Sequence, residues 1–205
     1  MTRDEIGRQV SESGTEFVSL QFTDIVGVVK SVTIPVQELD VALDRGIWFD
    51  GSSVEGFARI AESDMYLVPD LDTFAVIPWS QDSGPTARFI CDVYTPSGEP
   101  FAGDPRHVLK RALGKAESMG FEYRTGPEPE FFLFRRDGDG HATPQPHDQG
   151  GYFDLSTDRG EEVRKKMSKA LAAFGIRVEA SHHEVATGQH EIDFRYTDAL
   201  RAGTM

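Results

Sequence analysis

Two glutamates that could share one chemical task stand in residues 126–131 (GPEPEF). Side chains two apart on a strand point to the same face, so Glu128 and Glu130 are expected to lie side by side. Adjacent carboxylates repel each other unless water, a proton or a cation separates them. A pair of hard divalent ions bound by oxygen ligands is one solution. The plainer alternative, which this segment alone favours, is two solvated glutamates at the start of a strand.

Residues 182–191 (HHEVATGQHE) combine three histidines with two glutamates. Glu184 lies seven residues before Glu191, and a straight strand would place residues at that odd separation on opposite faces. A break at Thr187-Gly188 would let the two carboxylates converge. One interpretation of this segment is a metal site. The other is that the histidines are hydrogen-bonded within the fold.

A third candidate is residues 49–53 (FDGSS). Asp-Gly-Ser is common turn chemistry, and a turn is the favoured interpretation. An exposed Asp50 on a loop could also act as a general base or bind a cation. The sequence contains neither a P-loop nor a GxGxxG pattern, so a nucleotide would have to bind without those phosphate cradles.

The amino-acid composition is that of a folded protein that does not bind nucleic acid. The 205 residues carry 21 basic and 34 acidic side chains, a net charge of −13, which disfavours binding to nucleic acid. Hydrophobic residues make up 39% and aromatic residues 10%, enough for a folded core. The single cysteine, Cys91, lies in an apolar run and is expected to be buried and inert. No signal peptide and no membrane-spanning stretch is evident, so a cytoplasmic protein is expected.

These groups must be positioned by an α+β chain, whose first hundred residues predict a small mixed unit. Pro35 ends the second strand of a predicted hairpin, and Thr23-Asp24 supplies turn chemistry. The expected elements are a hairpin within 16–34, a helix over 36–44, a loop over 50–64, and strands at 65–68, 74–78 and 88–94. Residues 95–100 (TPSGEP) indicate a linker.

A second unit is predicted to begin with a helix that has Asp104 as N-cap and Pro105 as its first residue, and that ends near Gly120. After it we expect a strand pair at 122–124 and 128–135, a loop over 137–151, a helix over 159–174, and strands at 177–181 and 189–196. The buried stripe of the later helix is predicted to comprise Val163, Met167, Ala170, Leu171 and Phe174. Residues 197–205 show no closure of this unit, which indicates a truncated chain.

Taken together, these segments resemble glutamine synthetase of the bacterial and archaeal class. The matching pieces occur in the family's order over nearly the whole chain: 48–53 (WFDGSS), 62–65 (ESDM), 126–131 (GPEPEF), 151–154 (GYFD), 182–186 (HHEVA) and 188–191 (GQHE). The resemblance implies an N-terminal β-grasp domain over residues 1–100. Residues 101–205 would then be the incomplete start of a catalytic domain with a curved antiparallel sheet.

The resemblance also implies a glutamate–ammonia ligase, which uses ATP to join ammonium to glutamate through γ-glutamyl phosphate. Such enzymes hold two divalent ions, Mg²⁺ or Mn²⁺, at each site. By position, Glu130, Glu184 and Glu191 resemble the ligands of the ion nearer glutamate, and Glu128 a ligand of the ion on the ATP phosphates. The other matches are Asp50 as the residue that binds ammonium and takes its proton, Asp64 and Tyr152 in the ammonium pocket, Glu179 and His182 near the nucleotide, and Arg59 in feedback by glutamine.

The family's members are much longer than this chain, so the chain alone is expected to be inactive. The resemblance implies a homo-oligomer, a dodecamer of stacked rings, with Asp50 donated to a neighbouring subunit. Its expected partners are glutamate, ammonium and ATP, and neither nucleic acid nor membrane. Alternatives are a ligase that takes another amine, which Asp50 weakly disfavours, a short non-catalytic protein that docks on full-length subunits, and a small metal-binding module.

Overall fold

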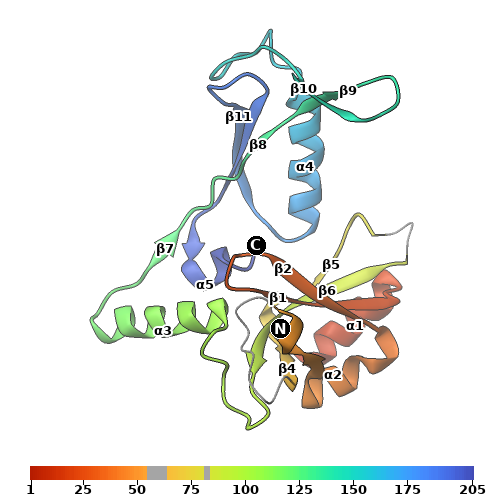
Figure 1. Cartoon of the computed structure of the whole chain (residues 1–205), viewed down its shortest axis with the longest axis vertical. Coiled ribbons are helices and arrows are strands. Elements are labelled where there is room, and N and C mark those ends of the chain that lie inside the picture. The colour runs from red at the N-terminus through yellow and green to blue at the C-terminus, as the bar shows by residue number, and fades with distance from the viewer. Residues whose placement is uncertain (55–63, 81–83) are drawn as a thin grey trace. The chain divides into compact units, whose positions relative to one another are not determined.

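The structure is a computed structural model that describes residues 1–54, 64–80 and 84–205, apart from the side chain of Ser53 (Figure 1). Its contacts divide the chain into two compact units, Met1–Tyr123 with Thr204 and Arg124–Gly203 with Met205. Each unit is described by itself. The predicted division between residues 100 and 101 stays a prediction about the sequence domains. None of the helices in the described ranges is long and apolar enough to cross a membrane.

The first unit is built on a mixed sheet with the strand order β2-β1-β6-β4-β3, and β5 pairs with β6. Strands β1 and β6 are parallel, and the other pairs are antiparallel. The predicted hairpin is confirmed, and Asp24 forms its turn by accepting hydrogen bonds from Val26 and Val28. The strands are β1 Phe17–Thr23, β2 Val29–Pro35, β3 Ile47–Asp50, β4 Asp64–Pro69, β5 Ala75–Val76 and β6 Thr86–Tyr94.

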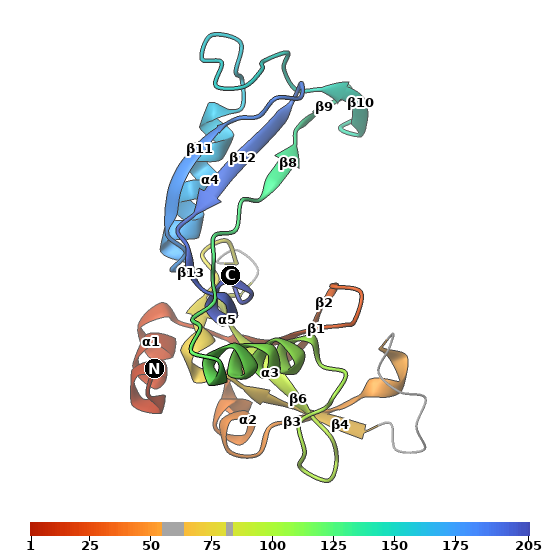
Figure 2. The same ribbon diagram turned by 90° about the vertical axis from the view of Figure 1, so that its left-hand side faces the viewer.

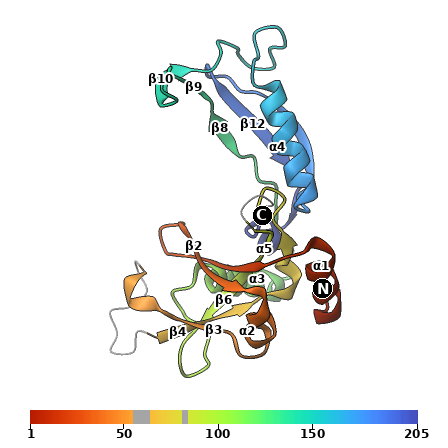
Figure 3. The same ribbon diagram turned by 90° about the vertical axis from the view of Figure 1, so that its right-hand side faces the viewer.

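Two α-helices pack on this sheet, α1 (Arg3–Ser13) and α2 (Leu39–Arg45) (Figure 3). The core between them and the strands includes the fully buried Ile6, Leu20 and Phe89. The expected helix over 36–44 is present as a short 3₁₀ turn, η1 (Val36–Glu38), that runs into α2. Two further 3₁₀ turns are η2 (Gly51–Ser53) and η3 (Leu71–Thr73).

Helix α3 (Pro105–Ser118) begins as predicted, with Asp104 as its N-cap. The buried Asp104 carboxylate accepts hydrogen bonds from the backbone N–H groups of Arg106, at 2.9 Å, and Val93, at 3.1 Å. The Arg106 guanidinium in turn pairs with Asp70 and with Asp92. These ion pairs hold α3 against the sheet of the first unit.

The second unit contains a three-stranded antiparallel sheet, with the order β11-β12-β8, and helix α4 lies alongside β11 and β12 (Figure 2). Two further strand pairs are β9 with β10 and β7 with β13. The elements are β7 Arg124–Thr125, β8 Glu130–Phe132, β9 Phe134–Arg136, β10 Ala142–Pro146, α4 Glu161–Ala173, β11 Val178–His183, β12 Gln189–Phe194, β13 Thr197–Asp198 and α5 Ala199–Ala202.

The predicted strand pair at 122–124 and 128–135 is wrong. Strand β7 pairs with β13, and β8 pairs with β12. Pro127 and Pro129 lack the N–H group that a ladder needs, and their carbonyl groups accept hydrogen bonds from Phe194 and Ile192 instead. The chain therefore joins the edge of β12 rather than folding back on β7.

Two other expectations need correction. The expected loop over 137–151 contains β10, which pairs with β9 across a turn closed by the Asp137 carboxylate. The predicted buried stripe of α4 is wrong: Met167 is 37% exposed, the other predicted residues are half-buried, and the helix buries Arg164 instead. Ion pairing explains this reversal, because Arg164 binds the carboxylate of Asp158.

Candidate metal and substrate site

The hairpin of β11 and β12 brings Glu184 and Glu191 together. In the register of this hairpin His182 lies opposite Glu191. The chain reverses over residues 184–188, where Gly188 takes a left-handed φ of +72° that other residues rarely adopt. The predicted break at Thr187-Gly188 is therefore confirmed. Ligand atoms of His182, Glu184 and Glu191 all lie within 4.8 Å of one another.

The buried carboxyl group of Glu191 is strongly perturbed. Burial first, then a hydrogen bond with Glu184 and the charge of Asp193, raise its pKa to about 7. Glu191 therefore holds its proton more strongly than an ordinary glutamate does. A divalent cation would replace that proton and relieve the repulsion, because hard cations prefer carboxylate oxygens.

His182 completes this set. Its Nδ1 lies 3.1 Å from the carbonyl oxygen of His183, which can only accept, so Nδ1 carries a proton. Its Nε2 faces Glu191 Oε2 at 3.5 Å. In the neutral ring that nitrogen keeps a lone pair, so the donor set of two carboxylates and one imidazole fits Mn²⁺, and the carboxylates alone fit Mg²⁺.

Glu130 flanks the same group from the third strand. It lies directly opposite Glu191 in the pairing of β8 with β12, so the two side chains share a face. Its Oε2 accepts a hydrogen bond from Gln189 Nε2 at 2.6 Å. Glu128 precedes β8 and is exposed, and its negative charge contributes to the raised pKa of Tyr152. The structure thus brings Glu130, Glu184 and Glu191 to one sheet face and places Glu128 before the strand.

Tyr152 and Phe153 cover this group from the loop between β10 and α4. Their rings make edge contacts with His182, at centroid distances of 5.3 and 4.8 Å. Partial burial first, and then the charges of Glu184 and Glu191, raise the pKa of the Tyr152 hydroxyl. Tyr152 therefore lies at the carboxylate cluster.

The first unit contributes a separate acidic pair. Asp50 at the end of β3 lies opposite Asp64 at the start of β4, and both are exposed. The Asp50 carboxylate also accepts a hydrogen bond from Ser52 N at 2.9 Å, so the favoured turn interpretation is confirmed. Like charges directly opposite each other repel, and a small cation between them would relieve this repulsion.

The remaining predicted positions are less clustered. Glu179 is exposed at a register shift between Val178 and Ala180, and the structure groups His182 with Glu184 and Glu191. Arg59 lies outside the described residues.

Two family models match successive parts of the sequence. Residues 14–96 match the family model described as glutamine synthetase, beta-Grasp domain, and residues 102–203 match the model described as glutamine synthetase, catalytic domain. The chain belongs to the glutamine synthetase family. This membership confirms the expected α+β fold class, a β-grasp domain followed by the start of the catalytic domain. The family comprises ligases of glutamine synthesis that generally use ATP and divalent metals.

Curated relatives cover almost the whole chain. It is 54% identical over 200 residues to the glutamine synthetase of Clostridium saccharobutylicum, covering 97% of this chain and 45% of the relative. It is 53% identical over 203 residues to the glutamine synthetase of Staphylococcus aureus, covering 98% of this chain and 46% of that relative. The chain therefore spans just under half the length of the curated relatives it matches.

Solved structures agree with the fold. A structure titled "Apo GmaS without ligand" has a TM-score of 0.81 at 28% identity, over 95% of this chain and 46% of that one. A glutamine synthetase of Plasmodium falciparum has a TM-score of 0.80 at 22% identity, over 98% of this chain and 46% of that one. At this identity the likeness supports the fold and nothing further.

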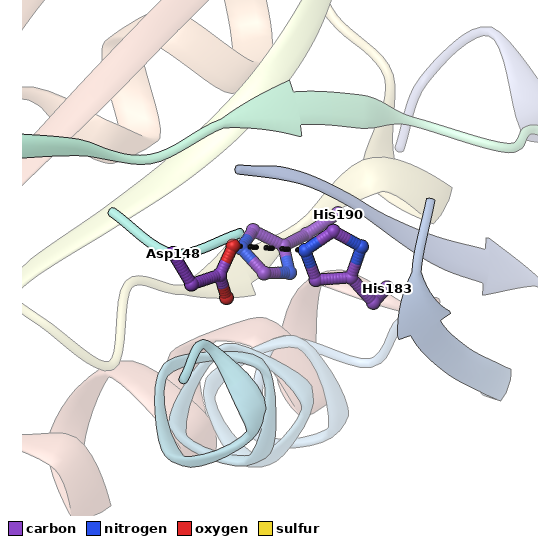
Figure 4. A group of neighbouring side chains, drawn as sticks. All are labelled: Asp148, His183 and His190. Atoms are coloured by element: carbon purple, nitrogen blue, oxygen red, sulfur yellow. Dashed lines mark hydrogen bonds and ion pairs between the residues drawn. The ribbon is translucent and has the colours of Figure 1, made fainter. Parts of the chain in front are cut away.

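A buried polar cluster lies under the hairpin of β11 and β12, and the sequence did not predict it as a unit (Figure 4). His183, on β11, binds the Asp148 carboxylate, and His190, on β12, binds Arg164. Although burial opposes it, hydrogen bonds to Asp148 and to the Glu184 carbonyl raise the pKa of His183. Burial first, and then the Arg164 charge, lower the pKa of His190. The alternative of histidines hydrogen-bonded within the fold is therefore confirmed for both.

A glycine packs directly on this cluster, which gives a test of its rigidity. A Cβ on Gly160 would lie 2.3 Å from Cε1 of His190. Gly160 is the N-cap of α4 and its backbone angles are open to alanine, so Gly160→Ala acts mainly through the steric clash, with a smaller loss from the poorer cap. We expect a loss of about 1–3 kcal/mol in the free energy of unfolding.

Urea unfolding followed by far-UV circular dichroism would measure this loss. Gly114→Ala on α3 is the matched control, because a Cβ there meets no atom within 4 Å. Alanine favours helix by up to about 1 kcal/mol over glycine, so the control is expected to be as stable as the wild type or more so. Equal stability of the two variants would contradict the packing seen around His190.

Proposed function

We propose that this chain is the N-terminal part of a glutamate–ammonia ligase, which forms glutamine from glutamate and ammonium with ATP through γ-glutamyl phosphate. The convergence of Glu130, Glu184 and Glu191 on one sheet face supports this proposal most strongly. Three carboxylates on one sheet face suit a divalent cation, because hard cations prefer carboxylate oxygens.

The reaction explains the need for such a group. The γ-carboxylate of glutamate is a poor electrophile, and phosphoryl transfer from ATP activates it. Bound Mg²⁺ or Mn²⁺ ions would neutralise the charge that develops in this transfer. In our proposal Glu130, Glu184 and Glu191 hold the ion nearer glutamate, and Glu128 helps to hold the ion on ATP. By resemblance Glu179 and His182 would lie near the nucleotide, and His182 would also lie beside the cation held by Glu184 and Glu191.

Ammonium requires a different group, because it is not a nucleophile until it loses a proton. Asp50 is the proposed acceptor of that proton. Its position opposite Asp64 on the β-grasp sheet would attract a small cation. Tyr152 would line the ammonium pocket from the catalytic domain. We also propose a cytoplasmic homo-oligomer, a dodecamer, in which Asp50 serves a neighbouring subunit.

A chimera tests the proposal. The chain would replace the matching segment of the Clostridium saccharobutylicum relative, and the purified product would be assayed for glutamine formation and ADP release. We expect the chimera to form glutamine, and the 205-residue chain alone to form none, since the rest of the catalytic domain is needed.

The outcomes separate the alternatives. A folded chimera that uses methylamine or a polyamine but not ammonium would show an amine ligase. A folded chimera without ATP turnover on any acceptor, beside an active relative, would support a non-catalytic docking protein.

A further inference from the structure

The buried cluster beneath the carboxylates contains a charged pair, Asp148 and His183, with exposed fractions of 2% and 1%. Figure 4 shows the Asp148 carboxylate directed at the His183 ring, with the His190 ring beside them. The proposed function assigns neither Asp148 nor His183 a contact with glutamate, ammonium or ATP.

Hydrogen bonding fixes the state of the His183 ring. Its Nε2 lies 2.9 Å from Asp148 Oδ1, and its Nδ1 lies 2.6 Å from the carbonyl oxygen of Glu184. Both partners can only accept, so both ring nitrogens donate. The ring therefore connects the Asp148 carboxylate to the backbone of Glu184, a residue of the proposed cation site.

The same ring also connects to the loop that carries Tyr152. The other oxygen of Asp148 accepts a hydrogen bond from Arg159 N at 2.8 Å. The backbone N–H of Phe153 donates to the carbonyl oxygen of His183 at 3.2 Å. A Cβ on Gly150 would lie 2.8 Å from Cδ2 of His183, so the loop packs closely against the ring.

A buried metal ion is the other use that Asp148, His183 and His190 could have, since their ligand atoms lie within 4.8 Å of one another. The hydrogen bonds argue against it. Both nitrogens of His183 carry protons and offer no lone pair. Arg164 can only donate to His190 Nδ1, at 2.8 Å, which leaves the proton of the neutral ring on Nε2.

We propose that Asp148 is a positioning residue for the divalent-cation site. Through His183 it fixes the backbone of Glu184, and with it the direction of that carboxylate, and it holds the Tyr152 loop over the site. This inference rests on the proposed function, because it assumes that Glu184 and Glu191 bind the cation. Outer partners that orient metal ligands typically contribute 10- to 100-fold to metal affinity.

Calorimetric titration of the 205-residue chain with Mn²⁺ tests the inference. We expect Asp148→Asn to weaken Mn²⁺ binding by about 10-fold or more, and His183→Gln to weaken it by a similar factor. Asp148→Asn/His183→Gln should bind no more weakly than the weaker single variant, because both changes break one link. Asp104→Asn is the matched control, since it alters another buried, hydrogen-bonded aspartate in the first unit and should leave Mn²⁺ affinity unchanged.

Glu191→Gln separates the two proposals. If it leaves Mn²⁺ binding unchanged, the proposed cation site is wrong. If it removes binding while folded Asp148→Asn binds like the wild type, only the positioning role is overturned. Additive losses in the double variant would also overturn it. If circular dichroism shows that Asp148→Asn is unfolded, the Mn²⁺ affinity of His183→Gln tests the positioning role instead. If neither variant folds, the cluster is required for the fold and the positioning role is overturned.

Discussion

Glu191→Gln is expected to lower the Mn²⁺ affinity of this chain by at least about 100-fold, more than the loss of an outer partner would. Glutamine keeps the size of the side chain and can still hydrogen-bond Glu184, but it removes one of the charges that attract the ion. Calorimetric titration at pH 8 measures the change. Glu162→Gln, which alters an exposed acid on α4, is the matched control and should bind like the wild type. Equal affinities of the two variants would show that the ion binds elsewhere.

The pH dependence of stability, compared between the wild type and Glu191→Gln, tests the role of Glu191 independently. Folding raises the pKa of Glu191 from 4.5 to about 7. A carboxyl group with a raised pKa contributes stability below pH 4.5 and loses that contribution as the pH approaches 7. The metal-free wild type should therefore lose stability over this range relative to Glu191→Gln. Mn²⁺ at pH 8 should restore it in the wild type alone, which thermal unfolding midpoints would show.

Asp50→Asn is expected to lower the ammonium-dependent kcat of the chimera by about 10²- to 10⁴-fold, the usual contribution of a general base. Asparagine retains the oxygen that accepts the hydrogen bond of Ser52 N, so the turn at the end of β3 should persist. Hydroxylamine is largely neutral near pH 7 and needs no base to become a nucleophile. Activity with hydroxylamine should therefore fall much less.

The control for this change is Asp137→Asn. Asp137 also accepts hydrogen bonds from backbone N–H groups in a surface turn, those of Asp139 and His141. The control should retain full activity with both acceptors. An equal loss with ammonium and hydroxylamine in Asp50→Asn would mean that Asp50 is not the proton acceptor.

Local chemistry made several elements predictable from the sequence. Pro35, Asp104 and Gly188 act on their own backbone or on that of near neighbours, so the end of β2, the start of α3 and the reversal after β11 follow from residue type. The convergence of Glu184 and Glu191 follows from that reversal. The proposed catalytic and binding roles of these residues come from the family resemblance, because the geometry alone does not assign them.

Long-range partners explain what could not be predicted. The pairing of Pro127 and Pro129 with β12 depends on a strand that occurs about sixty residues later in the sequence. Burial of Arg164 depends on Asp158 and on His190, and no local pattern marks an arginine as interior. The Asp148 and His183 pair is equally invisible, because its members lie 35 residues apart.

The source of the three carboxylates also has a consequence for how the chain folds. Glu184 and Glu191 come from one short hairpin, which can form within about 1–10 μs. Glu130 joins them only when β8 docks on β12, which closes a loop whose ends, Glu130 and Gln189, are separated by 59 positions in the sequence. Closing such a loop costs conformational entropy, and an ion bound by all three carboxylates would offset part of that cost. Bound metal should therefore stabilise the docked position of β8 more than it stabilises the hairpin.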